Sequence, residues 1–319
     1  MTMLVRPYTD ADADGWDQFC EQSLQATLLH TRRFLSYHGE RFTDQSLIIT
    51  NEEGKWLGLF PAALQPGDAR AVASHPGSTY GGIVHQGQLR GELMLAALTA
   101  ICRHYRDAGL QWLRYKVVPS FYHKQPAQDD IYALFRLDAR RYRCDLSSTI
   151  DLARRTPPGE RRRRSLKKAQ KGGIEVSPEK TLLPALWQIL EDNLARKHGA
   201  RPVHDLAEIT LLAERFPQQI LLACALQAGA AVAGVVLFVS DTCYHTQYIA
   251  ASEAGYQTCA LDAVFEAIIF DARAAGKRWL DFGICNEQNG QILNEGLYRF
   301  KTEFGGGGTV HEFYEISLD

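Results

Sequence analysis

Two stretches of the chain, AALTAICRHYRDAGLQWL at 96–113 and AVFEAIIFDARAAGKRWL at 263–280, repeat one another at a constant offset of 167 residues. Each has apolar residues at helical spacing, a glycine where a helix would end, and then a strand-like segment. Trp112 and Trp279 fall at the same place in the two copies. An internal repeat of this length predicts two copies of one supersecondary unit.

The flanking segments follow the same order in both halves. The stretches at 46–64 and 220–239 each predict a strand, a tight turn and a second strand before the repeated helix. Strand, hairpin, strand, helix, strand, helix and strand in this order predict the α/β class with a mixed sheet. We expect two domains, at 1–152 and 153–319. The alternative is a chance similarity between two ordinary amphipathic helices.

Composition narrows the classes of function. The chain of 319 residues carries 35 Lys and Arg against 37 Asp and Glu, a net charge of −2, which argues against a general nucleic-acid coat and against DNA as a partner. Seven dispersed cysteines without a CxxC pair are typical of reduced thiols in a cytoplasmic protein. No Cys/His spacing predicts a metal site, and no apolar run predicts a membrane-spanning helix.

A strongly basic segment lies near the junction of the two copies. Residues 154–171 hold nine Lys and Arg but one acid, Glu160. A solvated helix face is the usual meaning of such a run, and contact with a polyanion is the sharper interpretation. The residues that we expect to bind the polyanion are Arg161, Arg164, Lys167 and Lys168.

The segment LNEGLYRFKTEFGGGG at 293–308 predicts a short helix followed by a flexible loop. Its expected core stripe is Leu293, Leu297, Phe300 and Phe304. Its expected polar flank, which would line a cleft, is Asn294, Tyr298 and Lys301. The first copy has Leu134 and Phe135 opposite Phe300 and Lys301, so we place the reactive site in the second copy. The alternative is a lysine whose stem lies on apolar surface.

Two further sets of polar residues are candidates for substrate binding. The loop SHPGSTYGG at 74–82 and the strand after the first repeated helix offer Ser74, His75, Ser78, Thr79, Tyr80, Tyr115 and Lys116. We expect this set to hold an acceptor, and the alternative is a surface loop of turn residues.

The second set lies in the second copy. In YHTQYIA at 244–250, alternation would place His245, Gln247 and Ile249 on one face and Tyr244, Thr246 and Tyr248 on the other. Asn286 and Glu287 follow the strand WLDFG in a turn, where a carboxylate would take a proton from an attacking amine. A buried, hydrogen-bonded histidine is the alternative for His245. No order of Ser, His and Asp indicates a covalent nucleophile.

Three motifs in order resemble the FemABX family, a tandem pair of GNAT folds whose members transfer aminoacyl groups from tRNA to build peptidoglycan cross-bridges. They are RRRRSLKKAQKGGIEV at 161–176, WLDFGICNEQNG at 279–290 and LNEGLYRFKTEFGGG at 293–307. The resemblance covers nearly the whole chain. The chain departs from CoA-binding GNAT proteins at SEAGYQTCALD, 252–262, which keeps one glycine where those proteins have several.

The resemblance implies an acyltransferase with a donor co-substrate, aminoacyl-tRNA or acyl-CoA, and no permanently bound cofactor. It matches Lys301 to a lysine that contacts donor phosphate, whereas a CoA-type GNAT would use Tyr298 as the acid that protonates the thiolate. With Glu287 and His245 these are the candidate catalytic residues. Candidate substrate contacts in this copy are Gln247, Tyr248, Asn286 and Asn294.

The expected acceptor is an amine of a nucleotide-linked or lipid-linked cell-envelope precursor, and tRNA is the expected macromolecular partner. Two other functions stay open. One is an acyl-CoA-dependent N-acyltransferase that acts on an amino sugar in surface-polysaccharide biosynthesis. The other is a tandem-GNAT protein that binds tRNA or a nucleotide sugar without catalysis.

Overall fold

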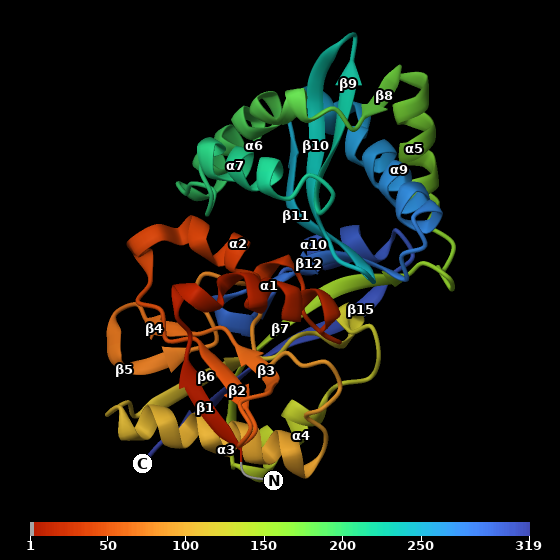
Figure 1. The fold of residues 1–319 in the computed structure, drawn as a ribbon. Coiled ribbons are helices and arrows are strands. Elements are labelled where there is room, and N and C mark those ends of the chain that lie inside the picture. The colour runs from red at the N-terminus through yellow and green to blue at the C-terminus, as the bar shows by residue number, and fades with distance from the viewer. Residues whose placement is uncertain (1–2) are drawn as a thin grey trace. The chain divides into compact units, whose positions relative to one another are not determined.

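The computed structural model describes residues 3–319, and for residues 197 and 198 it describes the backbone alone. The chain divides into two compact units, each with its own strands and helices (Figure 1). Unit 1 comprises Met1–Asp145 together with Val310–Asp319, and unit 2 comprises Leu146–Thr309. Both units mix strands and helices, so the predicted α/β class is confirmed.

Unit 1 contains a small antiparallel sheet and a second group of strands. The small sheet has the order β1 (Leu4–Pro7), β2 (Leu47–Thr50), β3 (Trp56–Phe60). The second group has the order β4 (Ala63–Gln65), β5 (Asp68–Ala73), β6 (Trp112–Lys116) and then β15 (Gly307–Ser317). The helices are α1 (Ala13–Gln22), α2 (Arg32–Leu35), α3 (Glu92–Asp107) and α4 (Asp129–Arg136). Leu98 and Ile101 of α3 are buried against Leu113 of β6, which explains the helical spacing of apolar residues.

Unit 2 is built on a mixed sheet with helices on both faces. Its strands follow the order β7 (Arg140–Asp151), β12 (Trp279–Ile284), β11 (Cys243–Ala251), β10 (Ala230–Val239), β9 (Ile220–Gln227) and β8 (Ile174–Ser177). A short hairpin is formed by β13 (Asn286–Glu287) and β14 (Ile292–Leu293). The helices are α5 (Glu160–Lys171), α6 (Leu183–His198), α7 (Leu206–Arg215), α8 (Glu253–Thr258), α9 (Ala260–Ala274) and α10 (Glu295–Thr302).

The core of unit 2 lies between the sheet and α9. Phe265 and Ile268 of α9 pack with Leu280 and Phe282 of β12. In Figure 1, α9 and α5 cover one face of this sheet, while α6 and α7 cover the other. The alternation of Leu280 and Phe282 with Asp281 therefore points Asp281 toward the face that α6 and α7 cover.

The structure confirms the internal repeat. Trp112 opens β6 and pairs with Ala71 of the parallel strand β5, and Trp279 opens β12 and pairs with Cys243 of the parallel strand β11. In each copy the repeated helix, α3 or α9, connects the two parallel strands. The two tryptophans are thus structurally equivalent.

The units divide differently from the predicted domains. The sequence predicts one boundary at 152/153, whereas the structure has one at 145/146 and returns Val310–Asp319 to unit 1. The reason is the antiparallel pairing of Phe313–Ser317 in β15 with Trp112–Lys116 in β6. Pairing between strands so far apart in sequence leaves no local signal.

The expected helix and loop near residue 300 also differ from the structure. Leu293 pairs with Asn286 in the hairpin, so α10 begins only at Glu295, and Leu293 and Leu297 are exposed at 41% and 37%. The start of the glycine run is closely packed: a Cβ at Gly305 would lie 2.0 Å from a carbonyl oxygen of Thr156. Glycine is needed there for close approach and for a φ of +100°, rather than for flexibility.

Candidate active site

Two neighbouring strands of unit 2 part at His245 and Asp281. β11 and β12 pair in parallel at Cys243↔Trp279, Tyr244↔Leu280 and His245↔Asp281. β11 continues to Ala251, without a β12 partner among the described residues after His245. Backbone N–H groups on this side of β11 are therefore available to a ligand.

A network of hydrogen bonds orients His245. Asp281 is fully buried (0% exposed) and its Oδ2 lies 2.7 Å from Nδ1 of His245. The hydroxyls of Ser147 and Thr149 in β7 donate to Oδ1 of the same carboxylate, and Thr149 Oγ1 lies 2.6 Å from Thr309 Oγ1. An ionised carboxylate only accepts, so Nδ1 carries the proton and Nε2 is left as an acceptor.

This arrangement occurs in one of the two copies. The third pair of the equivalent parallel strands in unit 1 is Ala73↔Arg114, where unit 2 has His245↔Asp281. The side chain of His245 is 12% exposed, so its ring reaches the surface of unit 2. A histidine fixed by a buried carboxylate is the usual arrangement for a general base.

A bulge in β11 changes the faces of the next residues. Tyr244 and Ile249 both pack with the α9 core, although strict alternation would put them on opposite faces, so the predicted two-face pattern is wrong. The pairing with β10 skips Gln247, between Thr246 and Tyr248. Burial raises the pKa of the Tyr248 hydroxyl to about 12, and the neighbouring Gln247 opposes that shift. The bulge thus brings Gln247 and Tyr248 together.

Tyr248 connects β11 to the helices that cover this face. Its hydroxyl lies 2.5 Å from Nδ1 of His204, in the segment between α6 and α7, and its ring packs edge-on against Trp187 of α6 at 4.9 Å. Trp187 and His204 are buried, at 1% and 4% exposure. Tyr248 therefore fixes the segment before α7 to the strand that carries His245.

Lys301 lies inside unit 2, not on a cleft-lining flank as the sequence predicts. It is 4% exposed, and its Nζ donates to the carbonyl oxygens of Gly283 and Ile284, each at 2.9 Å. Burial lowers its pKa, while the nearby thiol of Cys285 opposes that shift. A Cβ at Gly283 would lie 3.5 Å from Cε1 of His245, so Lys301 fixes the backbone beside the imidazole. A contact with donor phosphate would require the ammonium group to leave both carbonyls.

We expect Lys301→Met to destabilise the protein by about 2 kcal/mol or more, because two buried carbonyls lose their donor. Urea unfolding measures this effect. Lys180→Met is a matched control, since Lys180 also donates to two carbonyls, those of Ala213 and Pro217, from a more exposed position, and its loss should cost clearly less. A Lys301→Met protein as stable as the wild type would show that these two hydrogen bonds are not the role of Lys301.

The remaining candidates near α10 form a local cluster. Asn286 Oδ1 accepts from the backbone N–H of Leu146 at 2.6 Å, and Asn294 Oδ1 caps α10 by accepting from Leu297 N at 3.0 Å. Glu287 is exposed and accepts from Asn294 Nδ2 at 3.2 Å. Tyr298 is partly buried, and a Cβ at Gly308 would lie 3.0 Å from its hydroxyl. Asn286 and Asn294 thus have structural roles, while Glu287 and Tyr298 reach solvent.

The basic segment forms helix α5, whose residues differ in environment. Arg162 is buried, and its guanidinium lies 2.9 Å from the carboxylate of Asp262 in α9 and 3.2 Å from that of Glu303. Arg162 therefore has a structural role. Arg161, Arg164 and Lys168 are exposed and share one face, because they are three or four residues apart. Lys167 is also exposed but projects from another face of the helix.

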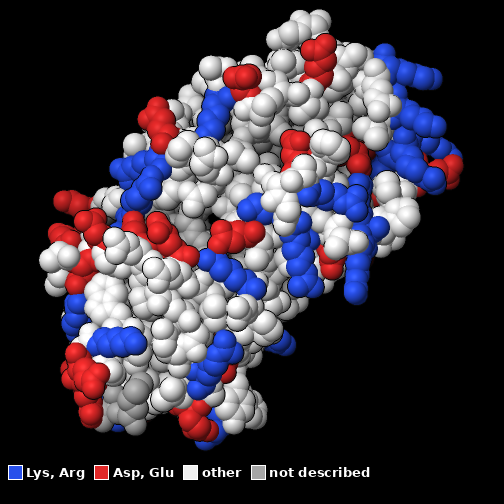
Figure 2. All heavy atoms as spheres, turned by 45° about the vertical axis from the view of Figure 1, so that its right-hand side comes forward, with Lys and Arg blue, Asp and Glu red and all other residues white. Residues whose placement is uncertain are grey.

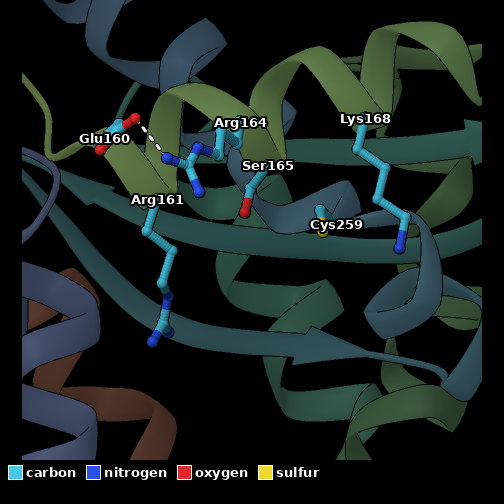
Figure 3. Close-up of a pocket in the computed structure, with 6 residues that line it drawn as sticks. All are labelled: Glu160, Arg161, Arg164, Ser165, Lys168 and Cys259. Atoms are coloured by element: carbon cyan, nitrogen blue, oxygen red, sulfur yellow. Dashed lines mark hydrogen bonds and ion pairs between the residues drawn. The ribbon is translucent and has the colours of Figure 1, made fainter.

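A pocket of about 420 Å³ lies beside this face of α5 (Figure 3). Its lining residues are Glu160, Arg161, Arg164, Ser165, Lys168 and Cys259. Figure 3 shows Arg161 and Lys168 extending from the helix on either side of Ser165, with Arg164 paired to Glu160. Arg161 lies 3.5 Å from Glu303, so the carboxylates offset part of this charge. The positive charge that remains around the hollow favours an anionic ligand.

In unit 1 the loop at 74–82 is folded around Lys116. Its Nζ donates to the carbonyls of His75, Pro76 and Ser78 at 3.1, 3.1 and 2.6 Å, and its backbone N–H donates to Ser74 Oγ at 2.7 Å. Burial, with a contribution from Arg143, lowers the pKa of Lys116 to about 7. The loop is therefore held by a lysine rather than lying loose on the surface.

The other expected acceptor residues of unit 1 are mostly interior. Ser74 and Tyr115 are 0% exposed, and Tyr115 donates to Asp130 at 2.9 Å and accepts from Ile83 N at 2.8 Å. Tyr80 is buried and donates to Thr27 at 3.0 Å. Of this set Thr79 is exposed. Ser74, Tyr80 and Tyr115 therefore make hydrogen bonds within unit 1, which gives them a structural role.

Comparisons with known proteins show which fold the chain shares. Residues 160–302, which lie inside unit 2, match the family model described as an acetyltransferase (GNAT) domain. FemX has the same fold along nearly its whole length, with a TM-score of 0.69, 11% identity, and 98% of this chain and 96% of that chain covered. The chain thus has a segment that matches a GNAT domain and, over nearly its whole length, the fold of FemX.

Two other solved structures share the tandem fold. One is the C-terminal domain of a putative lysylphosphatidylglycerol synthetase from Agrobacterium fabrum, with a TM-score of 0.62, 13% identity, and 98% of this chain and 92% of that chain covered. The other is a tandem GNAT protein from the clavulanic acid biosynthesis pathway, with a TM-score of 0.55, 12% identity, and 99% of each chain covered. No curated protein matches the sequence.

Two further observations concern membranes and metals. Within residues 3–319, no helix has both the length and the hydropathy that crossing a bilayer requires. Over the same span of described residues, His, Cys, Asp and Glu side chains do not gather in threes as they would around a metal ion.

Sequence reasoning misses the residues that orient His245. In the sequence Asp281 stands out only as a strand end, and Ser147, Thr149 and Thr309 are not among the candidates. A signal is present, because Ser147 and Thr149 are two residues apart in a strand and so share a face. What joins them to Asp281 is the antiparallel pairing of β7 with β12, in which Thr149 lies opposite Asp281.

Proposed function

We propose that unit 2 transfers an aminoacyl group from the ester of an aminoacyl-tRNA to an amine of a cell-envelope precursor. The observation that carries the proposal is the pair His245–Asp281 at the point where β11 and β12 part. It supplies an oriented base next to backbone N–H groups without a strand partner. These are the two things that aminolysis of an ester needs.

The reaction would proceed without an enzyme-bound acyl group. The amine nitrogen attacks the ester carbonyl carbon as His245 Nε2 takes a proton from it, and the oxyanion accepts from backbone N–H groups of β11 beyond His245. The new C–N bond forms, the C–O bond to the ribose breaks, and the imidazolium returns its proton to the departing ribose oxygen. Asp281 stabilises the imidazolium throughout, with Ser147 and Thr149 holding its other oxygen.

The choice of donor rests on the start of α9. CoA-binding GNAT proteins present a glycine-rich loop and the N-terminus of this helix to pyrophosphate. Here the short helix α8 replaces such a loop, and Asp262 in the first turn of α9 already pairs with buried Arg162 at 2.9 Å. A carboxylate at this position disfavours a second anion. The row Arg161, Arg164 and Lys168 instead offers phosphate contacts on α5.

A second candidate is acyl-CoA as the donor. The matching family is described as an acetyltransferase, and the tandem GNAT protein of the clavulanic acid pathway is described in a state without AcCoA. In this case the cations that line the pocket of about 420 Å³ on α5 would bind the phosphates of CoA. The acceptor in that case would be the amine of a surface-polysaccharide sugar.

The test is an incubation of the protein with a mixture of tRNA charged with labelled amino acids, or with labelled acetyl-CoA, and a panel of envelope precursors that carry amines. We expect labelled precursor from aminoacyl-tRNA and none from acetyl-CoA. Replacing the three cations beside the pocket, in the variant Arg161→Gln/Arg164→Gln/Lys168→Gln, should raise KM for the donor by tenfold or more. This corresponds to a loss of about 1.4 kcal/mol in binding free energy. Label transfer from acetyl-CoA alone would select the second candidate, and binding of tRNA without transfer from either donor would indicate a non-catalytic protein.

A further inference from the structure

The exposed side of α5 carries a second set of cations that the pocket does not use. Arg163, Lys167 and Lys171 are four residues apart and exposed, and we call them the outward row. At about 100° per residue this row lies roughly 110° around the helix from the pocket-facing residues. The residues turned toward the core, Arg162 and Ala169, are on the remaining side.

The charge of the outward row is not compensated. Among the described side chains none makes an ion pair or side-chain hydrogen bond with Arg163, Lys167 or Lys171, whereas Arg155 and Arg162 are neutralised by Glu266 and Asp262. This is unusual in a chain with more Asp and Glu than Lys and Arg. Figure 2 shows Lys and Arg side chains gathered at the upper right, where α5 comes forward. Concentrated, uncompensated positive charge raises the local concentration of polyanions.

The geometry points to an RNA backbone as the ligand of the outward row: we propose that these three cations bind phosphates of the donor RNA outside the pocket. At 1.5 Å per residue the row extends over about 12 Å, longer than one phosphate group. The cations beside the pocket, Arg161, Arg164 and Lys168, would then hold the end of the RNA that carries the ester. The outward row would hold the part of the RNA farther from the ester. The inference rests on the proposed function in one respect, namely that the bound RNA carries an aminoacyl group.

An anionic membrane is the competing partner, and α5 does not fit it. A helix that lies in a membrane surface needs an apolar face toward the acyl chains. The apolar residues of α5, Leu166 and Ala169, are partly and fully buried, and those that project outward are Arg, Lys and Gln. The exposed face of α5 therefore carries positive charge but no apolar side chain that could enter the acyl chains.

The experiment measures binding of uncharged bulk tRNA at several salt concentrations between 50 and 200 mM. The outward-row variant is Arg163→Gln/Lys167→Gln/Lys171→Gln. The matched control, Lys55→Gln/Arg70→Gln/Arg103→Gln, removes the same charge from exposed positions of unit 1. We expect the outward-row variant to lose about tenfold or more in affinity and to reduce the log–log salt slope by roughly two to three, with the control near the wild type.

Equal tRNA binding by the outward-row variant and the control overturns the inference. So does row-dependent binding to phosphatidylglycerol vesicles without binding to tRNA. The two proposals fail separately. Row-dependent tRNA binding without aminoacyl transfer would uphold the outward row and refute the proposed function. Aminoacyl transfer with the same KM for charged tRNA in the outward-row variant would refute the row and leave the function intact.

Discussion

His245→Ala is expected to slow acyl transfer by about 10²- to 10⁴-fold, or about 3 to 5 kcal/mol in activation free energy. The reason is that the amine must lose a proton as it attacks, and Nε2 of His245 is the acceptor that Asp281 orients. Single-turnover rates with saturating donor and acceptor measure the chemical step directly. KM should change little, because the effect falls on the transition state.

Asp281→Asn tests the same step through the orientation of the ring. An amide keeps the shape but offers an N–H group, so it no longer fixes the proton on Nδ1. We expect a slower rate with a retained fold. Because His204→Gln removes a histidine that contacts Tyr248 rather than Asp281, it serves as a control for histidine replacement. Wild-type rates in His245→Ala would remove the histidine from the mechanism.

Acidification to pH 5 is expected to destabilise the protein by several kcal/mol through three buried histidines of unit 1. Burial lowers the pKa of His30 to about 4, of His85 to about 4 and of His75 to about 3. In the unfolded chain each imidazole takes up a proton below about pH 6.5, whereas in the fold each stays neutral until much lower pH. Stability is therefore unaffected above about pH 6.5 and is lost as the pH falls below it.

The size of this effect is about 2 kcal/mol per histidine at pH 5. Asp130 and Asp262 act in the opposite direction, because burial raises the pKa of each carboxyl to about 6, and each offsets about 1 kcal/mol. Urea unfolding at pH 7.5 and at pH 5 measures the net loss. His85→Gln, which cannot take up the proton, should reduce the net loss by about 2 kcal/mol. Equal stability at both pH values would mean that these rings are not held neutral by the fold.

The repeat and the fold class could be predicted from sequence because both depend on local patterns, namely apolar residues at helical spacing and strand-like segments in a fixed order. The glycine and tryptophan after each repeated helix mark the start of equivalent strands, and the structure places Trp112 and Trp279 accordingly. The exchange of the C-terminal strand could not be predicted in this way, since residues 313–317 pair with a strand about 200 positions earlier.

The candidate site could be predicted only in part, for a similar reason. His245 and the exposed row of α5 stand out by residue type, as do Tyr248 and Gln247, but the bulge that brings the last two together does not. The sequence misplaces Lys301 because the carbonyls that hold its ammonium group, those of Gly283 and Ile284, come from the end of β12, and residue type and helical spacing do not indicate that contact. Asp281 becomes visible as a partner of His245 only when the strands are in register.

A double-mutant cycle on the single-turnover rate of acyl transfer measures whether His245 and Asp281 act together as one base. If Asp281 works only by orienting and stabilising the ring of His245, its replacement has nothing further to remove once the ring is absent. We predict that His245→Ala and His245→Ala/Asp281→Asn are equally slow, within about twofold. A double variant slowed by the product of the two single effects would contradict it.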